Sequence, residues 1–403
     1  MKFTSEKINE FKNTILSNIE ANKKNYIQIS HSIHKRPELG NQEFFASNIL
    51  TETLEKQGFN IEKGVAGHKT SFIAKKCSKE KKGATIGFLA EYDALPNLGH
   101  ACGHNIIGTT SVAAAIALSK VIDEVGGEII VLGTPAEEGG ENGSAKASFV
   151  KYGLLKGIDA CIIAHPSSRT GITGDSLCVD PLDFEFIGRP AHAAACPEKG
   201  INALDGVIQL FNGINALRQH LSKDARIHGI ITHGGDAPNI VPEYAKARFF
   251  IRAATRKSCD EVTTKVKNIA KGAALATGCA VNIITFQNRV DNMLKNSVFD
   301  NIFVENLNFL GFDTDRKKAS GIGSSDVGNI SHVVPTIQPT IKIGPDTLVG
   351  HTSEFCDAAI SKQGDEALII GAKAIALTGL SLLAYEDKLK SITDEFHRAL
   401  ATE

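Results

Sequence analysis

The sequence carries almost no net charge. Its 403 residues include 44 Lys and Arg against 45 Asp and Glu, so the formal net charge is −1. No global field therefore favours nucleic acid or an anionic membrane as a partner. We expect small molecules or another protein chain instead, with neither nucleic acid nor a membrane involved.

An uninterrupted apolar segment of the kind that targets or anchors a chain is also absent. The N-terminus MKFTSEKINEFKN mixes charged and apolar residues, whereas a secretory signal needs a continuous apolar core. The most apolar long run, residues 367–384, contains Lys373 and two glycines, which favours a buried helix over a membrane span. We therefore expect a cytoplasmic protein.

The eight cysteines lack the spacing of a disulfide framework. In a long chain without a secretory signal they are expected to be reduced thiols. Seven of them are interpreted as small buried hydrophobes or surface thiols. Cys102 differs, because it lies in GHACGHN with His100 and His104 as neighbours.

Apolar runs and helical patterns alternate along the chain, without tandem repeats or low-complexity linkers. Residues 84–92, 128–134 and 158–164 have the composition of buried strands, and helical patterns begin at Ile106 and Ser144. This order predicts an α/β fold with a mostly parallel sheet and helices on both faces. A chain of this length is expected to form two domains.

The middle of the chain has a different order of elements. Residues 178–289 read as strand, helix, strand, strand, helix, strand, which predicts an inserted ferredoxin-like α+β domain. The α/β pattern resumes afterwards. We therefore expect a discontinuous catalytic domain, formed by residues 1–177 and 290–403.

Polar clusters follow each predicted strand of the first domain, at the edge of the sheet where ligands bind in such folds. They would bring together Cys102, His104, Glu137, Glu138 and His165. Zn²⁺ accepts mixed sulfur, nitrogen and oxygen ligands, and metal hydrolases need an additional unligated carboxylate to move a proton. Taken singly, CGH fits an ordinary turn, the two glutamates a solvated acidic turn, and His165 a strand end; their coincidence favours a metal site.

Five ordered motifs carry a family resemblance: HACGHN, PAEEGG, the His165-Pro166 step, GRPAHAA and GHTSEF. Together they resemble the aminoacylase and carboxypeptidase family of dinuclear metallopeptidases (clan MH), from SHSIHKRPELGNQE to the last apolar helix. Many cysteine-bearing relatives have Asp after CGH. Asn105 instead matches the aminobenzoyl-glutamate hydrolase and aminoacylase-like dipeptidase branch.

The resemblance implies a role for each site residue. Cys102 would bridge two divalent ions, zinc or else manganese or cobalt, with His104, Glu138, His165 and His351 as further ligands. Glu137 would be the general base and then the general acid, and Asp93 would orient a ligand histidine. The inserted domain would be a lid and a homodimer surface. Its His192 would stabilise the oxyanion in the partner's site, and Asn239 and Arg252 would bind the substrate carboxylate.

These residues predict a metal-dependent amidohydrolase that uses metal-activated water, with Glu137 as its base. The substrate would be a dipeptide, an N-acyl amino acid or aminobenzoyl-glutamate. A peptidase for longer peptides and a non-catalytic metal-binding regulatory protein remain alternatives, although Glu137 argues against the second. A nucleotide-binding α/β protein is disfavoured, because no glycine-rich loop follows the first strand. GSSDVGN, residues 323–329, reads as a glycine-rich turn that the resemblance places near the site.

Overall fold

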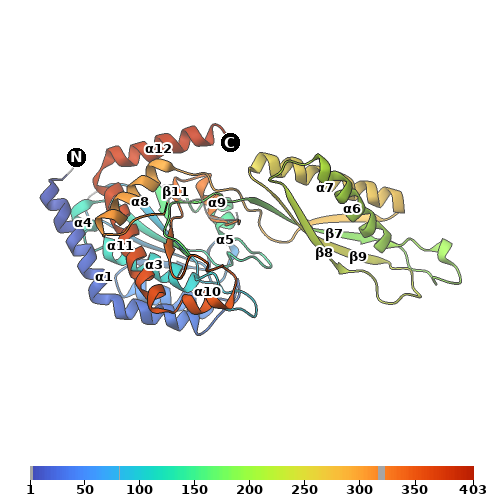
Figure 1. Ribbon diagram of the computed structural model, residues 1–403, viewed down its shortest axis with the longest axis horizontal. Helices are drawn as coiled ribbons and strands as arrows, with labels where there is room; N and C mark the ends of the chain where they lie inside the picture. The colour runs from blue at the N-terminus through green and yellow to red at the C-terminus, as the bar shows by residue number, and fades with distance from the viewer. Residues whose placement is uncertain (1–2, 81, 316–322) are drawn as a thin grey trace. The chain divides into compact units, whose positions relative to one another are not determined.

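The computed structural model describes residues 3–80, 82–315 and 323–403, which form two compact units (Figure 1). The first unit comprises Met1–Asp175, Met293–Ile322 and Asp326–Thr402. The second comprises Ser176–Asn292, Gly323–Ser325 and Glu403.

A six-stranded sheet with the order β1-β2-β4-β3-β5-β11 forms the centre of the first unit. The strands are β1 (Asn60–Lys63), β2 (Phe72–Cys77), β3 (Thr85–Ala90), β4 (Glu128–Gly133), β5 (Ala160–Ile162) and β11 (Thr336–Ile337). The β4-β3, β3-β5 and β5-β11 pairs are parallel, and β1 and β2 add an antiparallel edge. The prediction of a mostly parallel α/β sheet is confirmed.

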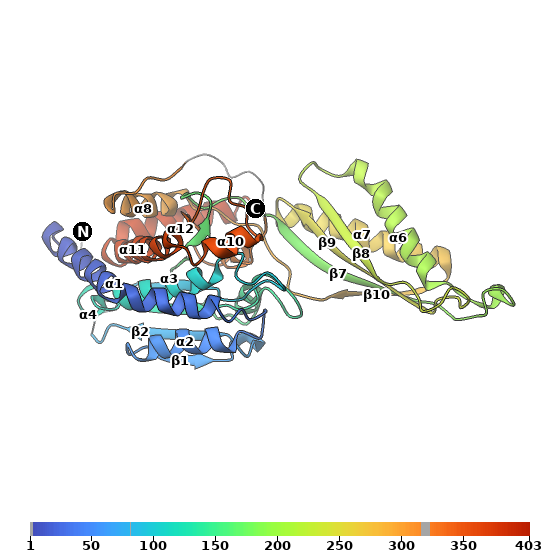
Figure 2. The ribbon, with the colours of Figure 1, turned by 60° about the horizontal axis from the view of Figure 1, so that its bottom comes forward.

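Helices cover both faces of this sheet, as the alternation of side chains in β4 shows. Ile129 and Val131 belong to the large core on one face, whereas Ile130 and Leu132 belong to a smaller core on the other. The helices of the unit are α1 (Ser5–His34), α2 (Phe44–Glu55), α3 (His104–Leu118), α4 (Ile122–Val125), α5 (Ala145–Lys151), α8 (Ser297–Phe309), α9 (Val327–Ser331), α10 (Ser353–Ala358), α11 (Lys362–Ala384) and α12 (Glu386–Leu400). Figure 2 shows α2 beside β1 and β2.

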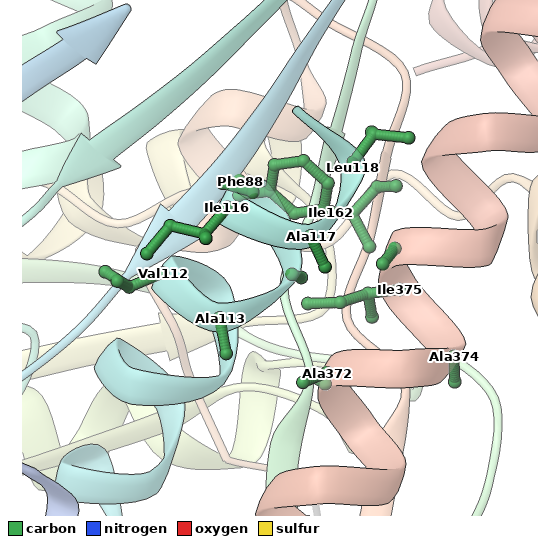
Figure 3. Close-up of a cluster of buried hydrophobic side chains, with 14 of the residues drawn as sticks. Phe88, Val112, Ala113, Ile116, Ala117, Leu118, Ile162, Ala372, Ala374 and Ile375 are labelled. Atoms are coloured by element: carbon green, nitrogen blue, oxygen red, sulfur yellow. The ribbon is translucent and has the colours of Figure 1, made fainter. Parts of the chain in front are cut away.

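The large core lies where α3 and α11 pack against each other and against β3. Figure 3 shows Leu118 of α3 and Ile375 of α11 among the buried side chains around Phe88. Within the described residues, α11 has the length and composition to cross a membrane, but most of its apolar stretch is buried inside this core. It is the buried helix that its sequence predicted.

The strand predicted over residues 158–164 is interrupted. Strand β5 ends at Ile162, and β6 (His165–Ser167) pairs in parallel with β12 (Thr340–Lys342) in a separate two-stranded sheet. The chain therefore changes sheet just before His165. Helix α3 also begins earlier than its apolar pattern predicted, so that His104 is its first residue.

The second unit has an antiparallel sheet with the order β10-β7-β9-β8. Its strands are β7 (Cys178–Ile187), β8 (Arg226–His233), β9 (Tyr244–Ala253) and β10 (Ala280–Thr285), and its helices are α6 (Ala203–Leu217) and α7 (Arg256–Thr277). Every second residue of β9 is buried, because α6 and α7 pack against one face. This is the predicted ferredoxin-like arrangement.

Candidate metal centre

Cys102 is presented by a tight turn between β3 and α3. Gly103 has a φ of 75°, a conformation that glycine adopts at little cost. A Cβ atom at this position would lie 2.4 Å from Cγ of Pro166. The turn thus brings the cysteine against the start of β6, where Sγ of Cys102 lies 3.6 Å from Nε2 of His165.

His104 is fully buried and held by Asp93. Its Nδ1 lies 2.9 Å from Oδ1 of Asp93 and 3.1 Å from the Asp93 carbonyl oxygen. Two acceptors on this side favour the tautomer that donates from Nδ1, which leaves the Nε2 lone pair available to a metal. Oδ2 of Asp93 also accepts a hydrogen bond from the backbone N–H of Glu138, at 3.0 Å, so one carboxylate positions both segments.

Glu137 and Glu138 lie in a turn after β4 that contains an unusual backbone conformation. Ala136 has a φ of 56°, a region that non-glycine residues occupy at some cost. Its N–H donates to Oε1 of the buried Glu43 at 2.9 Å, and its carbonyl accepts from Ser144 at 2.7 Å. These bonds hold the turn, so the two glutamates are presented rigidly.

His165 is the first residue of β6, and His351 lies in the loop before α10. Nδ1 of His165 bonds the Pro166 carbonyl at 2.7 Å, which leaves Nε2 toward Cys102. His351 has a φ of 62° and donates its backbone N–H to the Ala101 carbonyl at 2.9 Å. Its Nε2 lies 3.3 Å from Oε1 of Glu138, a contact that raises the pKa of the imidazole.

The donor atoms of these residues converge in three overlapping groups. The groups are Cys102–His104–His165, Cys102–Glu138–His351 and His104–Glu137–Glu138, with the ligand atoms of each within 4.8 Å of one another. Cys102, His104 and Glu138 each belong to two of these groups, so the three groups form one continuous set of donors. Nε2 of His104 is buried without a hydrogen-bond partner among the described residues. This unpaired nitrogen and the mixture of sulfur, nitrogen and oxygen donors fit a pair of divalent ions.

The electrostatics of the centre suit metal binding and proton transfer. Burial raises the pKa of the Cys102 thiol, so a cation is needed to hold the thiolate. Burial also raises the pKa of Glu137 well above its usual range, with Glu91, Glu138 and Asp326 adding repulsion. A carboxyl with a raised pKa is better suited to accept and return a proton near neutral pH.

Two polar side chains of GHACGHN, those of His100 and Asn105, take no part in these donor groups. His100 is buried and stacks on His34, with ring centroids 5.9 Å apart, and burial lowers its pKa to about 3. Asn105 is also buried, and its Nδ2 donates to Oγ of Ser30 at 2.9 Å and to the Ala359 carbonyl at 3.3 Å. An aspartate could not make the second bond, so Asn105 has a packing role that its sequence position did not suggest.

The three other predicted residues lie in the second unit. His192 is exposed, and its Nδ1 accepts from the N–H groups of Ala194 and Ala195 at 3.2 Å. The segments of His192 and Asn239 are neighbours, because the Ala193 N–H donates to the Asn239 carbonyl at 3.0 Å. Arg252 on β9 donates from Nη1 to Oγ of Ser324 at 2.7 Å, which connects it to the start of GSSDVGN.

A second group of buried charges was not predicted from the sequence. Glu91, Lys146 and Asp326 have fully buried side chains and form ion pairs near Glu137. The available signals were weak. Glu91 is a charged residue at the same strand end as Asp93. Lys146 is the one charged residue in the segment SAKASF.

Comparison with known proteins gives matches along most of the chain. The family model for the peptidase dimerisation domain of M20 peptidases matches residues 182–277. The Xaa-Arg dipeptidase of Mus musculus is 34% identical over 389 residues, which cover 93% of this chain and 89% of that protein. The chain belongs to the M20 peptidase family. The resemblance predicted from the five motifs is thereby confirmed.

Further relatives of this M20 peptidase agree on its class. One of the subunits of the p-aminobenzoyl-glutamate hydrolase of Escherichia coli is 33% identical over 73% of this chain and 64% of that protein. Among solved structures, a dinuclear metal-binding peptidase of the M20 family from Bacillus subtilis matches with a TM-score of 0.65 at 20% identity. That match covers 90% of this chain and 99% of the solved one. The chain is thus an enzyme, a hydrolase of the M20 peptidase family.

Proposed function

We propose that this M20 peptidase is a dinuclear dipeptidase, which hydrolyses the amide bond to a C-terminal amino acid with a free carboxylate. The observation that carries the proposal is the convergence of Cys102, His104, Glu138, His165 and His351, with the Glu137 carboxylate beside them. The long match to the Xaa-Arg dipeptidase favours dipeptides that end in arginine. N-acyl amino acids and aminobenzoyl-glutamate are the other substrates to test.

The chemistry divides between the metal ions and the protein. The ions, when bound, would supply the Lewis acidity that activates water and polarises the scissile carbonyl. Glu137 takes a proton from the attacking water and returns it to the nitrogen of the leaving amino acid as the C–N bond breaks. Asp93 keeps His104 in the tautomer and orientation that a ligand needs. Zinc is the ion that we expect, given a thiolate, three imidazoles and a carboxylate.

Residues suited to substrate recognition occur in each unit, considered separately. A cavity of about 690 Å³ opens beside Glu138 in the first unit, lined in part by Leu39, Asn41, Lys69 and Asn142; this volume suits a small ligand. Arg252 of the second unit has a buried Nε without a hydrogen-bond partner among the described residues. It therefore has a donor left for the substrate carboxylate. Asn239 would assist it, and His192 would stabilise the oxyanion.

We also propose that the chain forms a homodimer through its second unit. The match of residues 182–277 to a peptidase dimerisation domain supports this. So does strand β8, which lies at the edge of its sheet and exposes Ile230 to 63% and Ile231 to 45%. An exposed apolar edge strand is suited to pairing with a second copy.

A substrate panel tests the proposed function. Chelated protein would be reconstituted separately with Zn²⁺, Mn²⁺ and Co²⁺, and amino acid release measured from Xaa-Arg dipeptides, N-acetyl amino acids, aminobenzoyl-glutamate and tripeptides. We expect metal-dependent release from dipeptides and little from tripeptides. Bound metal without hydrolysis of any substrate would favour a non-catalytic protein, and preferred cleavage of tripeptides would favour a broader peptidase.

A further inference from the structure

Lys146 is a lysine whose side chain is fully buried, close to the start of α5. Its Nζ lies 2.6 Å from Oδ1 of Asp326 and 2.7 Å from Oε1 of Glu91, and all three side chains have an exposed fraction of 0%. The backbone N–H of Lys146 also donates to Oδ2 of Asp326, at 3.1 Å. Asp326 therefore binds one residue through both oxygens, which fixes the ammonium in position.

The charges in this group do not balance by themselves. A buried ammonium requires a partner, and Asp326 alone would neutralise Lys146. Glu91 is a second carboxylate on the same ammonium, so the group retains one negative charge. The two carboxylates of this group also lie close to Glu137: carboxylate oxygens of Glu91, Glu137 and Asp326 are within 4.8 Å of one another.

The unused oxygen of Glu91 lies beside the metal centre. Oε2 of Glu91 is 3.6 Å from Nε2 of His104 and has no hydrogen-bond partner among the described residues. Asp93 occupies the other nitrogen of His104, so Nε2 is the atom available to a metal ion. Lys146, which Asp326 holds in place, thus positions the Glu91 carboxylate beside the Nε2 atom of His104, the atom that would bind a metal ion.

The ammonium also determines the charge of Glu91. Nζ of Lys146, 2.7 Å from Oε1, stabilises the ionised form of the buried carboxylate. In a buried setting the attraction of this anion for a cation is weakly screened.

We propose that Lys146 is a positioning residue that holds Glu91 as a fixed anion beside His104, and that this anion strengthens binding of the adjacent metal ion. The inference rests on the metal centre of the proposed function. Glu91 acts through its charge, Lys146 acts through Glu91, and Asp326 keeps Lys146 in place. Supporting groups of this kind change metal affinity by about 10- to 100-fold in other metalloproteins.

The test is a zinc titration of the full chain against a competing chelator, with metal content measured separately. Glu91→Gln removes the charge while keeping the size, and leaves Lys146 paired with Asp326. Lys146→Met removes the ammonium, and Lys146→Arg keeps a cation. Asp300→Asn is the matched control, because Asp300 is a buried carboxylate of the same unit that accepts hydrogen bonds from Thr173.

We expect the wild-type chain to bind two zinc ions, and zinc affinity to be lower by about 10- to 100-fold in Glu91→Gln and Lys146→Met. Lys146→Arg should recover part of the loss, and Asp300→Asn should match the wild type. Circular dichroism of the metal-free proteins checks the fold. If Lys146→Met does not fold, Glu91→Gln decides the question.

Wild-type affinity in a folded Glu91→Gln would overturn the proposal, as would tighter binding in Lys146→Met. An equal loss in Asp300→Asn would also overturn it, because the effect would then be a general response to a lost buried charge. The outcome is independent of turnover. Zinc binding that depends on Glu91 in a protein without hydrolytic activity would contradict the proposed function and support this inference.

Discussion

At the scale of single residues, the geometry of the centre depends on Gly103. Gly103→Ala would place a Cβ atom 2.4 Å from Cγ of Pro166 in a left-handed conformation that costs other residues about 1–2 kcal/mol. We expect lower thermal stability and weaker zinc binding, because Cys102 and His165 would be pushed apart. Unfolding and chelator titrations measure the two effects.

The control for this substitution is Gly157→Ala. Gly157 also has a positive φ, of 87°, but no atom lies within 4 Å of its added Cβ. This variant therefore isolates the backbone cost, about 1–2 kcal/mol. Equal stability and equal zinc affinity in the two variants would show that the contact with Pro166 does not matter.

The buried carboxyl group of Asp300 should make the stability of the folded chain depend on pH. Burial raises its pKa to about 6, opposed by hydrogen bonds from Thr173. In the folded state it thus holds a proton that the unfolded chain releases at lower pH, so stability should fall as pH rises from about 4 to 6. The difference between the pKa in the folded chain and that in the unfolded chain corresponds to a loss of about 3 kcal/mol in the free energy of unfolding.

Urea unfolding of metal-free protein across this range, compared with Asp300→Asn, measures the effect. The variant cannot ionise at this position, so its stability should decline less between pH 4 and pH 7. Parallel pH profiles for the two proteins would mean that Asp300 retains an ordinary pKa.

The residue scale also shows what the sequence could predict about the site. Cys102, His104, Glu137 and Glu138 follow β3 and β4 at one edge of the large sheet, as expected. His165 joins them from β6, in the separate two-stranded sheet. The ion pairs among Glu91, Lys146 and Asp326 could not be predicted, because they join residues from distant segments without a recognisable motif. Proximity of this kind depends on side-chain packing.

At the scale of elements, α3 connects the core to the metal centre. Its first residue is His104, and its last, Leu118, is fully buried in the core shown in Figure 3. Leu118→Ala should lower the free energy of unfolding by about 2–5 kcal/mol through the cavity that it creates. Leu275→Ala is the control, because Leu275 is 85% exposed on α7 and should change stability by about 0.5 kcal/mol at most. Similar losses in the two variants would contradict the described packing.

The elements themselves were largely predictable from periodicity and composition. Strands such as β3 and β4 are buried on both faces and form continuous apolar runs. The interruption between β5 and β6 was not predictable, because residues 158–164 form one apolar run. The change of sheet depends on pairing of β6 with β12, whose partner residues lie far along the chain at 340–342.

At the scale of the whole molecule, the proposed homodimer predicts a concentration-dependent mass. Ile230→Lys would place a charge on the exposed edge of β8 and should shift the chain from dimer to monomer in size-exclusion chromatography with light scattering. Leu275→Lys on α7, which packs against β7, β9 and β10, should leave the dimer intact. A wild-type chain that remains monomeric would contradict the proposal.

The central claim is that five residues hold the metal pair while Glu137 moves the proton. It is tested most directly by the turnover number of Glu137→Gln on an Xaa-Arg dipeptide, measured beside its zinc content. We predict two zinc ions per chain, as in the wild type, with a turnover number reduced by about 10²- to 10⁴-fold. Wild-type turnover in the zinc-loaded variant would contradict the account.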